Sequence, residues 1–178
     1  MMTERCKGPI PDSYWVLPDR LLAGEYPGAK SETEAREKVR RFLDASVTFF
    51  LDLTEEGEYH LRPYAPLLRE EAASIGHSVT HRRMSIPDGD TPPAPEMTRI
   101  LDTVEAALAQ GHVVYIHCFG GIGRTGTVVG CFLVRHGLTG RQALDEILRL
   151  RQGTPDGDRR SPENNWQEQM VLDWPVGG

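Results

Sequence analysis

The stretch that most constrains this chain is residues 113–129, which read VVYIHCFGGIGRTGTVV. An apolar run typical of a buried strand leads into His117 and Cys118, and five residues, three of them glycine, precede Arg124 and Thr125. Glycines let the backbone turn tightly, so that successive N–H groups can point at one anion. The helix expected from Thr125 onward adds unpaired N–H groups and the positive end of its dipole. The stretch therefore predicts an anion cradle between a strand and a helix.

Cys118 and Arg124 give this cradle a specific chemistry. The helix dipole, the loop N–H groups and the nearby guanidinium all favour the thiolate of Cys118, which is the nucleophile that covalent catalysis needs. The planar fork of Arg124 can hold two oxygens of one oxyanion, which a lysine cannot do. The simpler alternatives are a buried packing cysteine and a solvated arginine, but neither of these needs a glycine cradle. The sequence therefore favours a catalytic site.

Residues 117–125, HCFGGIGRT, resemble the signature of the protein tyrosine and dual-specificity phosphatase superfamily, which is His-Cys, five residues, Arg, then Ser or Thr. The resemblance implies that Cys118 is the nucleophile and Arg124 the phosphate clamp. It implies that His117 orients the cysteine by hydrogen bonding and that Thr125 hydrogen-bonds the departing sulfur. A satisfied core histidine is the alternative for His117. The expected phosphate-binding positions are Phe119, Gly120, Gly121, Ile122, Gly123 and Arg124.

The general acid is expected in the loop 87–95, PDGDTPPAP. Expelling an alkoxide or phenoxide requires a proton, and the family takes it from an aspartate about 30 residues before the cysteine. Asp88 follows a proline, as in the Trp-Pro-Asp loop of tyrosine phosphatases, although Ile86 replaces the tryptophan. It also fits the Asp-Gly-x-Thr-Pro pattern of some dual-specificity members. Asp90 is the rival, and both aspartates are also common turn formers.

Gln167 is the candidate for positioning the hydrolytic water. It lies in the run SPENNWQ of residues 161–167, which resembles the Ser-Pro-Glu-Thr-x-x-Gln run of bacterial members, with Asn164 in place of the threonine. A plain helix-surface glutamine is the alternative.

The remaining cysteines, Cys6 and Cys131, suggest neither a zinc site nor a disulfide framework. Cys131 lies in an apolar stretch and is expected to pack in the core, the alternative being a resolving thiol that traps oxidised Cys118. We expect no metal and no cofactor.

Strand-like and helix-like segments alternate along the chain. Strands are expected over 14–16, 21–23, 47–53, 77–86 and 113–116, and helices over 31–44, 66–75, 95–110, 125–136, 141–152 and 163–173. Ser31 with Glu34 three residues later suggests a capping box. The alternation predicts an α/β fold with one central, mostly parallel, twisted sheet of four to five strands flanked by helices, with the phosphate loop between a strand and a helix.

The 178 residues suit one phosphatase domain over 1–178, with 1–12 as a loose N-terminal segment. The formal net charge of −6 argues against nucleic acid or an anionic membrane as partner, and no apolar run reaches membrane-spanning length. We expect a cytoplasmic monomer whose partner is a phosphorylated protein or a small phosphomonoester.

The predicted function is phosphomonoester hydrolysis through a phosphocysteine, as a tyrosine or dual-specificity protein phosphatase. One rival is an inositol phosphate or phosphoinositide phosphatase, although the uncharged residues 119–123 disfavour it. Another is a catalytically inactive phosphate-binding module, although such proteins usually lack the cysteine, the arginine or the acid. A rhodanese or low-molecular-weight phosphatase type is disfavoured because, in the low-molecular-weight members, the loop lies near the N-terminus.

Overall fold

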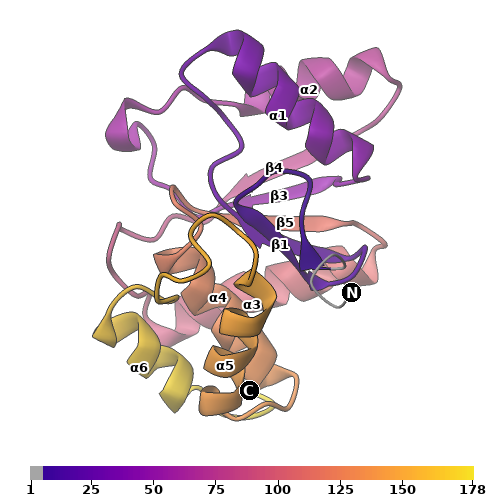
Figure 1. The fold of residues 1–178 in the computed structure, drawn as a ribbon. Coiled ribbons are helices and arrows are strands. Elements are labelled where there is room, and N and C mark those ends of the chain that lie inside the picture. Colours follow the sequence, from indigo (N-terminus) through magenta and orange to yellow (C-terminus); the bar gives the residue numbers. More distant parts are fainter. Residues whose placement is uncertain (1–5) are drawn as a thin grey trace.

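The computed structural model describes residues 6–178, in which five strands form one sheet (Figure 1). The spatial order is β1-β2-β5-β3-β4, and β2, β5, β3 and β4 are mutually parallel while β1 runs antiparallel to β2. The predicted mostly parallel sheet is confirmed. The strands are β1 (Ser13–Leu17), β2 (Leu21–Gly24), β3 (Phe49–Asp52), β4 (Thr80–Arg83) and β5 (Val114–His117).

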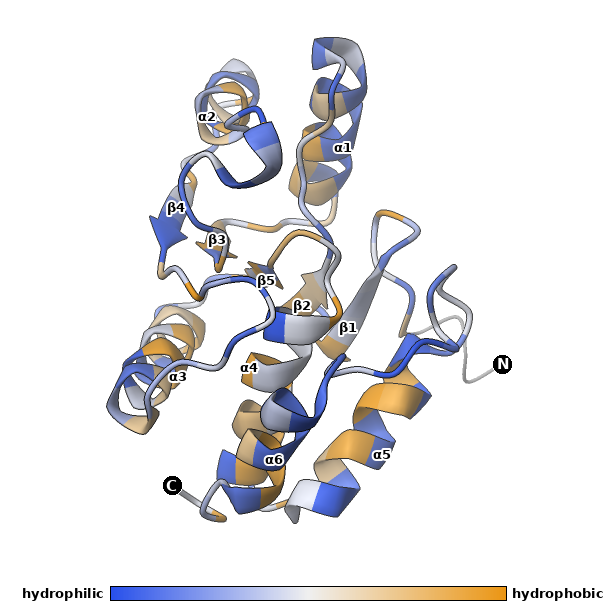
Figure 2. Ribbon diagram, turned by 90° about the vertical axis from the view of Figure 1, so that its left-hand side faces the viewer, coloured by the Kyte–Doolittle hydropathy of each residue, from blue (hydrophilic) through white to orange (hydrophobic). Residues whose placement is uncertain are grey.

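Helices cover both faces of this sheet, with α1 and α2 on one face and α3 to α6 on the other (Figures 1 and 2). Within residues 6–178, no helix is both long and apolar enough to cross a bilayer. The helices are α1 (Glu32–Asp44), the short 3₁₀ turn η2 (Glu58–His60), α2 (Ala65–Ser74), α3 (Ala94–Ala109), α4 (Gly123–Arg135), α5 (Gly140–Arg151) and α6 (Asn165–Asp173).

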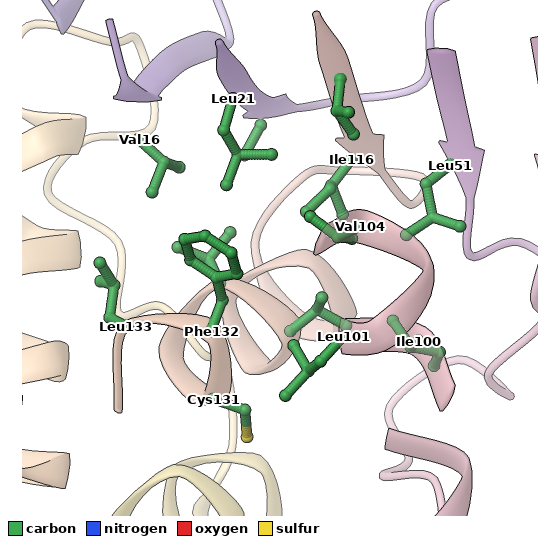
Figure 3. Packing of buried hydrophobic residues seen from close by; sticks show 14 of the residues in the cluster. Val16, Leu21, Leu51, Ile100, Leu101, Val104, Ile116, Cys131, Phe132 and Leu133 are labelled. Carbon is green, nitrogen blue, oxygen red and sulfur yellow. The ribbon is translucent and has the colours of Figure 1, made fainter. Parts of the chain in front are cut away.

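The central strands are apolar on both faces because each face supports its own core. Successive side chains of a strand point to opposite faces, so neighbours in sequence enter different cores. In β5, Ile116 packs with α3 and α4, while Tyr115 packs with α1 and α2. Figure 3 shows Leu21, Leu51 and Ile116 of the sheet directed toward side chains of α3 and α4.

Most of the predicted elements are present, but their ends differ. The strand expected over 77–86 is only four residues long, and three of its four side chains are exposed because β4 is the edge of the sheet. The helix expected from Thr125 begins at Gly123, so the loop between β5 and α4 is shorter than predicted. Ser31 caps α1 by accepting a hydrogen bond from the N–H of Glu34.

The N-terminal segment was expected to be loose through residue 12, and this is wrong for residues 7–12. Lys7 forms a bridge to Tyr14, the N–H of Gly8 donates to the carbonyl of Ser13 at 2.9 Å, and Ile10 is 2% exposed. An apolar side chain at Ile10 gives this segment a place in the core beside α1. Residues 1–5 of that prediction lie outside the described residues.

The parallel strands end at one edge of the sheet, and this edge positions the site. In the register of the sheet, His117 at the end of β5 lies opposite Gly24 of β2 and Asp52 of β3. The segments that follow these strands therefore meet where Cys118 begins the loop into α4. In open α/β sheets this carboxyl edge is where ligands bind.

Candidate active site

The loop from Cys118 to Ile122 turns the chain from β5 into α4. Gly121 has φ +73, and a Cβ at this position would lie 2.3 Å from the carbonyl carbon of Gly24. Both the left-handed backbone and the close approach require glycine here. The N–H of Gly121 donates to Sγ of Cys118 at 3.2 Å, so the turn directs a backbone dipole at the sulfur.

Four N–H groups of the loop are free of protein acceptors among residues 6–178. In the part of the chain that the structure describes, the N–H groups of Phe119, Gly120, Ile122 and Gly123 donate to no protein group. The loop carbonyls are held from outside, that of Phe119 by the N–H of Tyr26 at 2.9 Å and that of Ile122 by the hydroxyl of Ser161 at 2.7 Å. Cys118 is 3% exposed, at the base of this arrangement. Such free N–H groups at a helix start bind anions well.

Arg124 presents two hydrogen-bonding edges, and Glu58 takes the Nη1–Nη2 edge. Its side chain is 1% exposed. Nη1 donates to Oε2 of Glu58 at 2.8 Å and to the carbonyl of Ile86 at 2.9 Å, and Nη2 donates to Oε1 of Glu58. Nε is buried and has no partner among residues 6–178, and Nη2 lies 3.3 Å from Oδ1 of Asp88. The Nε–Nη2 edge is therefore the one that can hold two oxygens of an oxyanion.

Glu58 is a site residue that the sequence analysis missed. Burial opposes the charge of Arg124, but the carboxylate of Glu58, the neighbouring Cys118 and Asp88 outweigh it and raise the pKa of the guanidinium. Glu58 itself is 7% exposed in its side chain, and its Oε2 also accepts the N–H of Glu55 at 2.9 Å. The one sequence signal for Glu58 was its position after β3, because the segments that follow parallel strands meet at one edge of the sheet.

His117 is a neutral imidazole that ties the loop to α2. Burial lowers its pKa to about 4. Nδ1 lies 3.1 Å from the carbonyl of Cys118, which can only accept, so Nδ1 carries the hydrogen. Nε2 therefore accepts from the hydroxyl of Tyr64 at 2.6 Å, and burial keeps the pKa of that hydroxyl well above its usual value. His117 thus holds the backbone of Cys118, in line with the orienting role that the resemblance implies.

Behind His117 lies a buried carboxylate, Asp52, which the sequence analysis also did not identify. Its side chain is 0% exposed, and it accepts from the N–H and hydroxyl of Thr54 at 2.9 and 2.6 Å. It also accepts from His81 at 2.9 Å and Arg83 at 3.2 Å. Burial alone would raise the pKa of Asp52, but the hydrogen bonds from His81 and Thr54 outweigh burial and lower it. The carboxylate and its donors join β3 to β4 directly behind the loop.

The structure brings the side chain of Asp88, and not that of Asp90, to Arg124. Asp88 reaches Arg124 as described, and its Oδ2 accepts a hydrogen bond from the hydroxyl of Tyr59. The carboxylate of Asp90 instead accepts the N–H of Thr91 at 2.8 Å and so caps its own turn. This difference supports Asp88 as the candidate acid.

Gln167 is 0% exposed and connects α6 to the loop of residues 87–95. Its Oε1 accepts the N–H of Glu163 at 3.2 Å, and its Nε2 lies 3.4 Å from the carbonyl of Asp90. Asn164 caps α6 by accepting the N–H of Gln167 at 3.0 Å, and its own amide donates to the carbonyl of Gly89 at 2.9 Å. Asparagine is as good an N-cap as threonine, so this departure from the bacterial run does not disturb the helix start.

Thr125 and Cys131 lie on the helix that follows the loop. The hydroxyl of Thr125 is buried and has no hydrogen-bond partner in residues 6–178, so it is free to donate. Cys131 is 0% exposed, burial raises its pKa to about 12, and its side chain packs in the core (Figure 3). Over the described range there is also no group of three or more His, Cys, Asp or Glu that could hold a metal ion.

A cysteine and an arginine lie together in a glycine loop between a strand and a helix, at the carboxyl edge of the sheet, and this arrangement forms a candidate oxyanion site. The family model described as "Polymorphic toxin system, DSP-PTPase phosphatase" matches residues 26–138. The chain therefore belongs to the dual-specificity and tyrosine phosphatase (DSP-PTPase) family, and the predicted family is confirmed.

Named relatives agree with this assignment. Dual specificity protein phosphatase CDC14B of Mus musculus is 26% identical over 157 residues, which are 84% of this chain and 30% of that protein. Putative tyrosine phosphatase 067L of Invertebrate iridescent virus 3 is 32% identical over 127 residues, which are 68% of this chain and 45% of that protein. The crystal structure of Tk-PTP in the active form superposes with a TM-score of 0.65 at 26% identity, covering 87% of this chain and 90% of that one. The chain spans less than half the length of the two curated relatives.

Proposed function

We propose that the chain hydrolyses phosphomonoesters through a phosphocysteine at Cys118. The observation that carries this proposal is Arg124, a buried guanidinium beside the cysteine whose Nε has no partner within the described residues. A buried donor without an acceptor is costly unless a ligand completes it. The free N–H groups of the loop offer the remaining hydrogen bonds to the same anion.

In the first step the thiolate of Cys118 attacks phosphorus, and the bond from phosphorus to the ester oxygen breaks. The electron pair of that bond goes to the leaving oxygen, which takes a proton from Asp88. A phosphate held on the Nε–Nη2 edge of Arg124 replaces the contact between Nη2 and Asp88, so the carboxyl group is left facing the ester oxygen. The hydroxyl of Tyr59 keeps that carboxyl group close to the loop. Glu58 prevents the guanidinium from rotating.

In the second step water attacks the phosphocysteine, and Asp88 takes the proton of that water. The sulfur leaves as a thiolate, and the free hydroxyl of Thr125 is available to donate to it. Gln167 is proposed to position the water, which requires its long contact to the carbonyl of Asp90 to open. His117 fixes the carbonyl of Cys118 throughout. None of these roles involves a metal or a cofactor.

The proposed substrate is a phosphorylated protein, on tyrosine or with dual specificity. The names of CDC14B and 067L support a protein substrate, and the uncharged side chains of residues 119–123 offer no cations for the additional phosphates of an inositol phosphate. A cytoplasmic location, a monomeric state and a single domain over 1–178 stay predictions from the sequence.

Hydrolysis of phenyl phosphate by wild type, Cys118→Ser and Cys6→Ser tests this proposal, with a chelator present. Wild type and Cys6→Ser are expected to turn over, because Cys6 packs against the hydrophobic core and has no role in the proposed steps. Cys118→Ser is expected to bind inorganic phosphate without turnover, since serine keeps the cradle and loses the nucleophile. Near wild-type activity of Cys118→Ser, or a requirement for a divalent metal, would contradict the mechanism.

A further inference from the structure

A cavity of about 590 Å³ opens directly beside the phosphate loop, and we name it the side cavity. Phe119 and Gly120 of the loop form one wall, while Ala29, Tyr59 and Leu61 contribute to the others. These residues follow β5, β2 and β3, so the side cavity lies on the same edge of the sheet as Cys118. A volume of this size is typical of a ligand site rather than of a packing defect.

The wall nearest the catalytic residues is aromatic and exposed. The rings of Tyr59 and Phe119 lie 4.9 Å apart, and the two residues are 59% and 46% exposed. Exposed aromatic rings are costly in water and typical of binding surfaces. Because the hydroxyl of Tyr59 donates to Asp88, the wall connects the side cavity to the candidate acid. A chain extending from a phosphate at Cys118 would therefore pass along these rings.

Two of the charged groups that line the side cavity are cations already paired with acids. Lys38 lies 3.0 Å from Glu25 and also donates to two backbone carbonyls. Arg159 lies 3.7 Å from Asp156. These pairs contribute little net charge to the cavity.

Lys30 and Arg62 are the two remaining lysine and arginine residues of the lining, and neither has a carboxylate within 4.0 Å in the described part of the chain. Both are exposed at the rim, where Arg62 donates to the carbonyl of Lys30 at 3.3 Å. The side cavity is thus locally positive on a chain whose formal net charge is −6. Such a local excess attracts an anionic group.

We propose that the side cavity binds the residues next to the phosphorylated residue of a peptide substrate, and that Lys30 and Arg62 select an acidic side chain there. The inference rests on the proposed function and names the class of protein substrate. An apolar wall with two separate rim cations fits an amphipathic acidic peptide. It does not fit a compact polyphosphate, which needs several cations converging on one point.

The test compares kcat/KM for two phosphotyrosine peptides that differ only in the flanking residues, glutamate in one and alanine in the other. Wild type is expected to prefer the acidic peptide by about tenfold at low salt, since two rim ion pairs contribute about threefold each. Lys30→Gln with Arg62→Gln is expected to bring the ratio near one. The readout is the ratio within each variant, so a general change in folding or turnover cancels. Arg69→Gln, an exposed arginine of α2 outside the cavity, is the matched control and is expected to keep the preference.

Charge reversal sharpens the test, because Lys30→Glu combined with Arg62→Glu is expected to favour a peptide with lysine flanks over the acidic one. Equal rates for both peptides in wild type, or a preference unchanged in the double variant, would overturn the inference. Loss of activity on inositol polyphosphates alone in the double variant would also overturn it. Phenyl phosphate distinguishes failure of the proposed function from failure of this inference. If wild type does not hydrolyse phenyl phosphate, the proposed function is refuted. If it hydrolyses phenyl phosphate but does not prefer the acidic peptide, only this inference is refuted.

Discussion

Glu58→Gln is expected to weaken both the fold and the phosphate clamp. Arg124 is 1% exposed and makes two of its hydrogen bonds to the Glu58 carboxylate, whose side chain is 7% exposed. Breaking a buried ion pair costs about 3–5 kcal/mol when one charge is left without a partner. Glutamine keeps one acceptor, and the carbonyl of Ile86 still holds Nη1 at 2.9 Å. The expected loss in the free energy of unfolding is therefore about 2 kcal/mol.

The catalytic effect follows from the same contact. Without the second hydrogen bond the guanidinium can rotate, so its Nε–Nη2 edge no longer faces the phosphate position for part of the time. A loss of about 1.4–2.8 kcal/mol of transition-state stabilisation corresponds to a decrease of about tenfold to a hundredfold in kcat/KM.

Urea unfolding and phenyl phosphate kinetics measure the two effects of Glu58→Gln on the same preparation. Glu56→Gln is the matched control, because Glu56 is exposed two residues earlier in the same segment. The reasoning is refuted if Glu58→Gln stays within about 0.5 kcal/mol of wild type in unfolding and within about threefold in kcat/KM.

Two further predictions concern protons. The pKa of His117 falls from 6.5 to about 4 on folding. Between these pH values the unfolded chain therefore holds a proton on His117 that the folded chain does not. The free energy of unfolding should drop by about 3 kcal/mol as the pH falls from 6.5 to 4. Urea titrations at several pH values measure this; His117→Asn should flatten the dependence, and an equally steep dependence in that variant would contradict the assignment. For the acid, Asp88→Asn should lower kcat on a phosphotyrosine peptide by about a hundredfold or more and remove the fall in rate at high pH, whereas Asp90→Asn should do neither. If Asp90→Asn alone changes the pH–rate profile, the two roles are exchanged.

The parts of the site that lie in one continuous stretch were predictable from the sequence. Cys118, Arg124 and the glycines lie within seven residues, and a strand, a turn and a helix start are local features. The same is true of the helix cap at Ser31.

The contacts between separate segments were not predictable in this way. Glu58 lies 66 residues before Arg124, and Tyr64 lies 53 residues before His117. A glutamate after a strand has no local pattern that distinguishes it from its exposed neighbour Glu56. Its role depends on the sheet register, which brings the segments after β3 and β5 together. The shortness and the exposure of β4 were not predictable for the same reason, because only the order of the strands in the sheet shows that β4 is an edge strand.

The most direct measurement of the central claim is capture of the covalent intermediate. Wild-type protein mixed with a phenyl phosphate substrate is quenched in acid within the first turnover, digested and examined by mass spectrometry. The account predicts that the peptide containing Cys118 carries the mass of one phosphoryl group, and that this adduct is absent from Cys118→Ser. A phosphoryl group on a different residue would contradict the account. So would turnover by wild type and by Gln167→Ala, in which hydrolysis of the intermediate is expected to be slow, if neither protein shows the adduct at any quench time.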